Sequence, residues 1–86
     1  MRHPLFEGVS PARIAARAAA LGLEWQAVRP DIFGECEYYA DPPAWLDGWQ
    51  PKTRSGWQLV ATDIDQHGPI AYAVCPAYKL EELTAR

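Results

Sequence analysis

The sequence lacks the residue clusters that usually indicate catalysis or metal binding. Its histidines and cysteines (His3, Cys36, His67 and Cys75) are isolated, whereas metal ligands normally lie a few residues apart. Only two serines are present, and the six glycines form no phosphate-binding loop before a helix. We therefore predict no metal, no cofactor and no catalytic residues, and we expect that the protein is not an enzyme.

Long hydrophobic runs and closely spaced cysteines are absent as well. No run of 18 apolar residues exists, so we expect no membrane span. The Ala-rich stretch 14–23 is interrupted by Arg17 and indicates a helix rather than a signal peptide, which favours a cytoplasmic protein. Two cysteines are too few for a disulfide framework, and both free thiols and a single Cys36–Cys75 bridge stay open.

The chain also lacks an excess of basic residues and is small. Its formal net charge is −3, so we do not expect direct contact with nucleic acid. The 86 residues form one domain, 1–86, which buries about 60% of its extended surface and has room for one modest core. This size favours a binding module, an inhibitor or a subunit.

Three segments carry helix signals. Ser10 followed by Pro11 predicts a helix start with Ser10 as N-cap, and Gly22 predicts its end. The cap-like sequence from Asp41 and the stop at Gly48 predict a short helix at 42–47, and another is expected at 78–86. We expect the helices to pack on one face of the predicted sheet.

Alternating apolar residues indicate four strands, at 23–29, 33–39, 56–64 and 70–75, the last two joined by a turn at 65–69. Strands in neighbouring pairs favour antiparallel pairing. The predicted fold class is α+β: an antiparallel sheet of about four strands, with an N-terminal helix and a short C-terminal helix packed on it.

The middle of the chain combines acidic and aromatic residues in an unusual way. Segment 30–51 contains five carboxylates and no basic residue, and it also carries five aromatic side chains. Aromatic anchors with steering carboxylates are typical of an interface. The predicted partner-binding residues are Asp31, Glu35, Glu37, Tyr38, Tyr39, Asp41, Trp45, Asp47 and Trp49. The alternative stays open that the aromatics, Trp45 and Trp49 included, only cover a thin core while the carboxylates are solvated.

In size, acidity and lack of a catalytic signature, the chain resembles small phage-encoded inhibitors of the anti-CRISPR type. The resemblance is one of character over the whole chain and carries over no residue. It implies direct binding to a CRISPR effector complex and a block of target-DNA recognition. The expected partner is a protein or nucleoprotein complex with a basic surface, and the protein itself would be a monomer or, through an edge strand, a homodimer.

Two other functions remain as alternatives. A small nucleic-acid-binding domain would use as phosphate contacts Arg13, Arg17, Arg29, Lys52 and Arg54. A small enzyme or ligand carrier would use a pocket lined by Trp25, Tyr72 and Cys75.

Overall fold

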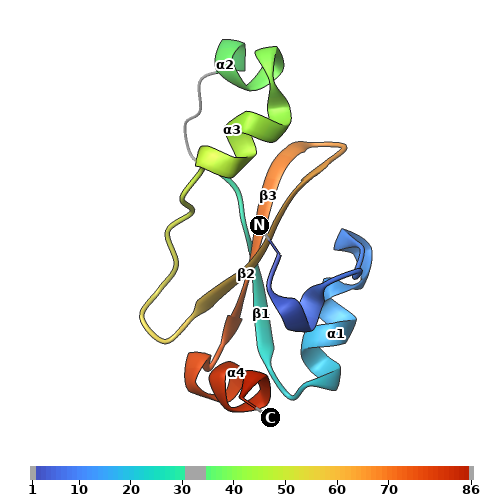
Figure 1. Ribbon diagram of the computed structural model, residues 1–86, viewed down its shortest axis with the longest axis vertical. Helices are drawn as coiled ribbons and strands as arrows, with labels where there is room; N and C mark the ends of the chain where they lie inside the picture. Colours follow the sequence, from blue (N-terminus) through green and yellow to red (C-terminus); the bar gives the residue numbers. More distant parts are fainter. Residues whose placement is uncertain (1, 31–34, 86) are drawn as a thin grey trace.

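The computed structural model describes residues 2–30 and 35–85, of which 35–37 by backbone alone. It has an α+β fold around an antiparallel sheet with strand order β1-β3-β2 (Figure 1). The strands are β1 (Glu24–Val28), β2 (Gln58–Asp65) and β3 (Gly68–Cys75). The helices are η1 (Pro4–Phe6) and η2 (Pro11–Arg13), both 3-10, and α1 (Ile14–Ala20), α2 (Glu35–Ala40), α3 (Pro42–Gly48) and α4 (Ala77–Thr84). None of the helices in these ranges has the length and apolarity needed to cross a membrane.

The core lies on one face of the central strand β3. Successive strand residues point to opposite faces, so Ile70, Tyr72 and Val74 share that face. They belong to one buried cluster that also includes residues from η1, α1, β2 and α4, among them Phe6 and Leu80. The N-terminal and C-terminal helices are therefore held to the sheet by burial of apolar side chains.

α1 departs from the sequence prediction at its start and agrees with it at its end. Ser10 makes no side-chain cap hydrogen bond, because the chain enters α1 through the 3-10 turn η2. Gly22 has a φ of 75° and ends the helix: its N–H bonds to the Ala19 carbonyl at 3.0 Å, and the Leu23 N–H bonds to Ala18 at 2.9 Å. The predicted stop at Gly22 is confirmed. Ser10 occupies the N-cap position of η2 with Pro11 directly after it, as predicted, but its side chain does not make the expected cap hydrogen bond.

The predicted strand at 33–39 is wrong, because residues 35–40 form the helix α2. Residues 31–34, which include Phe33, lie outside the described residues. The alternating pattern was too short to distinguish a strand from a single helical turn. Packing against α3 decides in favour of the helix, since the Tyr38 ring lies edge-on to the Trp45 ring at 5.5 Å. The described part of the sheet accordingly has three strands rather than about four.

The β2–β3 hairpin is confirmed with a tighter turn than predicted. Asp65 and Gly68 are paired strand residues, so the turn itself is only 66–67 rather than 65–69. Gly68 has a φ of 110°, and the Asp65 carboxylate accepts a 2.8 Å hydrogen bond from the His67 N–H. Pro69 fits into β3 because β1 pairs only from Ala71 onward, so no bond to β1 is lost there.

Candidate functional site

The acidic and aromatic segment forms a helical hairpin at one end of the molecule. In residues 35–48, called here the α2–α3 hairpin, the helix α2 packs against α3. Figure 1 shows the hairpin at one end of the long axis, on the opposite side from α4. The molecule measures 41 × 25 × 19 Å, and this placement contributes to its elongated shape. The hairpin therefore presents a surface that is separate from the core between α1, α4 and the sheet.

Local sequence signals explain α3. The Asp41 carboxylate accepts a 3.3 Å hydrogen bond from the Ala44 N–H, and prolines occupy the first helical positions. The short helix predicted at 42–47 is therefore confirmed. Because Asp41 caps α3, one of the predicted binding carboxylates also has a structural role.

Four aromatic rings of the predicted site form a continuous row along the hairpin and the residue that follows it, the α3 C-cap Trp49. The Tyr39 and Tyr38 ring centroids are 5.2 Å apart, and both the Tyr38–Trp45 and the Trp45–Trp49 centroids are 5.5 Å apart. The spacings and inter-ring angles are those of edge-to-face and tilted aromatic pairs. The structure thus brings these four predicted residues together.

Exposure differs sharply along this aromatic row. Tyr38 is 5% exposed, Trp45 and Trp49 are half-buried, and Tyr39 is 72% exposed. In this row the buried Tyr38 ring holds the hairpin together, and the Tyr39 ring is exposed at its outer end. The two tryptophans are neither fully core nor fully surface residues.

The predicted carboxylates are only partly described. Asp41 and Asp47 are exposed on α3. Glu35 and Glu37 belong to α2 by their backbone, but their side chains lie outside the described residues, as does the whole of Asp31.

No family model matches the chain, and no curated protein or solved structure matches it significantly. The function of this surface is therefore inferred from its geometry.

The basic residues of the nucleic-acid alternative are spread over different parts of the molecule. Arg13 ends η2 and Arg17 lies in α1, whereas Lys52 and Arg54 belong to the connection before β2. Figure 1 shows this connection and α1 on opposite sides of the sheet. The Arg29 guanidinium is engaged in an ion pair with Asp65. These five side chains do not form one basic face.

The alternative ligand pocket is not assembled either. The Trp25 and Tyr72 rings lie 6.3 Å apart on one face of the sheet. Cys75 follows Val74 by one residue and therefore points to the opposite face. Its thiol is free and donates a 3.2 Å hydrogen bond to Glu24. Burial and this hydrogen bond raise the pKa of the Cys75 thiol. The side chain of Cys36 lies outside the described residues.

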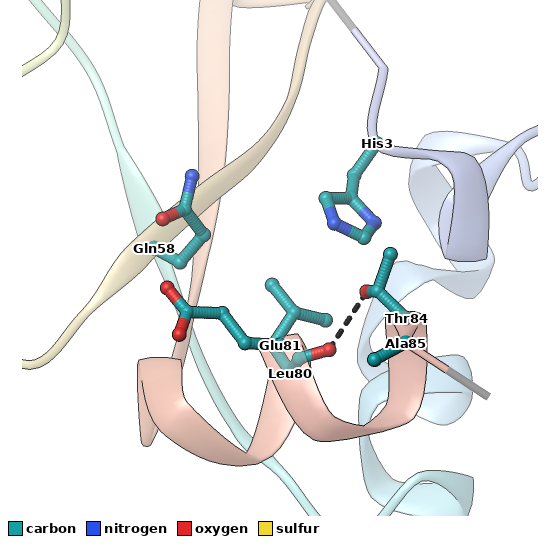
Figure 2. Close-up of a pocket in the computed structure, with 6 residues that line it drawn as sticks. All are labelled: His3, Gln58, Leu80, Glu81, Thr84 and Ala85. Carbon is teal, nitrogen blue, oxygen red and sulfur yellow. Dashed lines mark hydrogen bonds between the residues drawn. The ribbon is translucent and has the colours of Figure 1, made fainter.

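A pocket of about 360 Å³ lies between the N-terminal segment, β2 and α4 (Figure 2). Figure 2 shows the Gln58 amide and the Glu81 carboxylate on one side of it and the His3 ring on the other. His3 accepts a 3.2 Å hydrogen bond from the Leu5 N–H through Nδ1, and the Thr84 hydroxyl donates to the Leu80 carbonyl at 2.7 Å. Both groups therefore have structural roles.

Sequence reasoning missed this pocket, because its polar residues are far apart along the chain and follow no spacing pattern. It contains one carboxylate and one imidazole, which is fewer than a metal site needs. Within residues 2–30 and 35–85, no group of three His, Cys, Asp or Glu side chains is placed to hold a metal ion.

Proposed function

We propose that the protein is a protein-binding module whose α2–α3 hairpin docks on a partner with a basic surface. The observation that carries the proposal is the exposed Tyr39 ring next to the buried Tyr38 ring. Tyrosine is enriched at interfaces because it combines a large apolar area with a polar hydroxyl at small entropic cost. A ring already held by a buried neighbour loses little further freedom on binding.

Charge around the aromatic row supports a basic partner. Asp41 and Asp47 are exposed on the same hairpin, and segment 30–51 adds three further carboxylates without any basic residue. Carboxylates that surround an aromatic anchor accelerate encounter with a basic surface and reject acidic ones. They stay at the rim, where solvent remains and the cost of burying charge is small.

In its more specific form, the proposal makes the protein an inhibitor that occupies a nucleic-acid-binding groove. The carboxylates of the hairpin would take the positions of phosphates, and the resemblance to anti-CRISPR proteins implies that this binding blocks target-DNA recognition. A CRISPR effector complex is then the partner to test first. The support for this form is the acidity of the segment and the small size of the chain.

The test is capture of a partner from a nuclease-treated bacterial lysate by the immobilised protein. We expect Tyr39→Ser and Asp47→Lys each to weaken retention of the captured protein by about tenfold, since each removes one anchor or reverses one charge. Asp47 is chosen over Asp41 because Asp41 caps α3, whereas a cation near the C-terminal end of α3 is tolerated by the helix.

Matched controls come from α4. Tyr78 is 66% exposed, and Glu82 is an exposed carboxylate near the end of its helix, as Asp47 is in α3. Tyr78→Ser and Glu82→Lys should leave retention unchanged. Retention by all four variants equal to that of the wild type, or a partner that is retained from an untreated lysate but not from the nuclease-treated one, would contradict the proposal. For the specific form, the purified protein should reduce target-DNA binding by a reconstituted CRISPR effector complex.

A further inference from the structure

β1 has an unpaired outer edge. Only β3 pairs with it, and across residues 2–30 and 35–85 no backbone hydrogen bond joins β1 to any other segment. In an antiparallel ladder, every second residue of an edge strand directs its N–H and C=O groups outward. The opposite edge of the sheet differs, because the His3 N–H bonds to the Val60 carbonyl of β2 at 2.7 Å.

A groove runs along this free edge. One pocket of about 410 Å³ is lined by residues 26–29 of the β1 segment and 52–54 of the following connection. An adjoining pocket of about 400 Å³ is lined by 28–30 and 49–52. Consecutive strand residues point to opposite faces, so a pocket lined by four of them flanks the edge of the strand. We call these two pockets together the edge groove.

The described side chains that line the edge groove carry a net positive charge. Lys52 and Arg54 line it and are exposed, and neither side chain makes an ion pair or a hydrogen bond to the described part of the chain. The third cation, Arg29, is paired with Asp65. Among the described residues that line the two pockets there is no carboxylate. The groove therefore attracts negative charge from outside the chain.

We propose that an extended acidic peptide segment of a partner protein binds in the edge groove and adds to β1 as a fourth strand. Its backbone satisfies the outward N–H and C=O groups of β1, and its carboxylates pair with Lys52 and Arg54. This site takes the opposite charge from the α2–α3 hairpin, so it is a second binding surface that does not depend on the proposed function.

Two other occupants fit the groove less well. A second copy that paired β1 with β1 about a two-fold axis would bring both sets of Lys52 and Arg54 toward each other, and like charges oppose that contact. A single-stranded nucleic acid would pair its phosphates with the cations. However, a phosphodiester backbone supplies no N–H donors in the register that a strand edge requires.

The test uses a fluorescein-labelled peptide of alternating Glu and Val residues at low salt, with binding followed by anisotropy. One control peptide replaces Glu with Lys, and a second carries N-methyl groups on alternate amides, which keeps its charge and removes strand hydrogen bonding. The protein variant carries both K52E and R54E. R13E, at an exposed residue of η2, is the control charge reversal outside the groove. Circular dichroism confirms that the variants are folded.

We expect the Glu–Val peptide to bind and the double reversal to weaken binding by at least about tenfold, while R13E changes it by less than about twofold. Both control peptides should lose binding, and hydrogen exchange at the outward amides of β1 should slow in the complex. Absence of Glu–Val binding, equal binding of the N-methylated peptide, or equal binding by the double reversal overturns the proposal. Tighter binding of oligothymidylate, or self-association that protects the β1 amides, overturns it in favour of nucleic acid or a second copy.

Discussion

The Arg29 guanidinium and the Asp65 carboxylate form a two-bond ion pair, with Nη2–Oδ2 at 2.6 Å and Nη1–Oδ1 at 3.1 Å. Arg29 follows β1, and Asp65 is the last residue of β2, so the pair spans the sheet from one outer strand to the other. Nη1 also donates to the Pro69 carbonyl of β3 at 3.3 Å. This contact fixes the end of β1 that forms one wall of the edge groove.

The ion pair predicts a pH-dependent contribution to stability. The hydrogen bond from Arg29 lowers the pKa of Asp65, and the His67 N–H acts in the same direction. Since the folded pKa is lowered, the contribution is complete above the unfolded pKa of about 4 and is lost as the pH falls through the folded pKa. We expect D65N to lower the Tm by a few degrees near neutral pH and by progressively less below about pH 4.

Thermal unfolding of wild type and D65N across this pH range checks the prediction. E82Q, at an exposed residue of α4, serves as the control and should follow the wild-type curve. A Tm difference that stays constant down to the lowest pH would show that the ion pair contributes no pH-dependent stability.

Phe6 and Tyr39 should separate folding from binding. Phe6 is 0% exposed in the core cluster, so Phe6→Ala should lower the free energy of unfolding by about 3–5 kcal/mol. Tyr39 is exposed, and Tyr39→Ala should change the free energy by less than about 0.5 kcal/mol. Urea unfolding of both variants measures the two values. Similar losses in both variants would mean that Tyr39 belongs to the folding core.

Gly22 and Gly48 offer a matched pair of glycine substitutions. Gly22 has a positive φ, and an added Cβ would lie 2.6 Å from Lys79 Nζ, which donates to the Gly22 carbonyl at 3.1 Å. Gly22→Ala should destabilise by about 1–2 kcal/mol, because the left-handed conformation disfavours a Cβ. Gly48 lies in α3 with open space around it, so Gly48→Ala should be neutral or slightly stabilising. Urea midpoints test the difference, and equal effects would contradict the account of the α1 terminus.

The Cys75 thiol should react slowly with disulfide reagents at neutral pH. Burial and the hydrogen bond to Glu24 raise its pKa, so little of the reactive thiolate is present. In a Cys36→Ser background, E24Q should speed the reaction of Cys75 with a disulfide reagent at pH 8 by a few-fold, because it removes the neighbouring negative charge. An unchanged or slower reaction would mean that Glu24 does not influence the thiol.

Local signals in the sequence predicted those parts of the fold that depend on local chemistry. The Asp41 cap, the Gly22 stop and the alternation in β3 each correspond to backbone conformations that nearby residues determine. The strand predicted at 33–39 failed because its residues form a helix that packs on Trp45, and a contact between segments has no signature in either segment alone. The amino-acid composition of segment 30–51 therefore indicated where the candidate site lies but not how it is folded.

The same distinction applies to the candidate sites. The sequence could predict which residues belong to the aromatic row, since Trp45 and Trp49 lie one helical turn apart. The sequence could not predict that Tyr38 is buried and Tyr39 exposed. Adjacent residues of a helix differ in burial only through the direction in which each side chain points. The edge groove depends on where the connection before β2 runs beside β1, and only the tertiary structure determines that.

We propose that the α2–α3 hairpin makes the primary contact with a partner. Hydrogen exchange of the protein with and without its captured partner can locate that contact. We expect amide exchange in residues 38–48 to slow by at least about tenfold in the complex, while exchange in α1 and α4 stays unchanged. Protection confined to α1 or α4, with exchange in 38–48 unaltered, would contradict it.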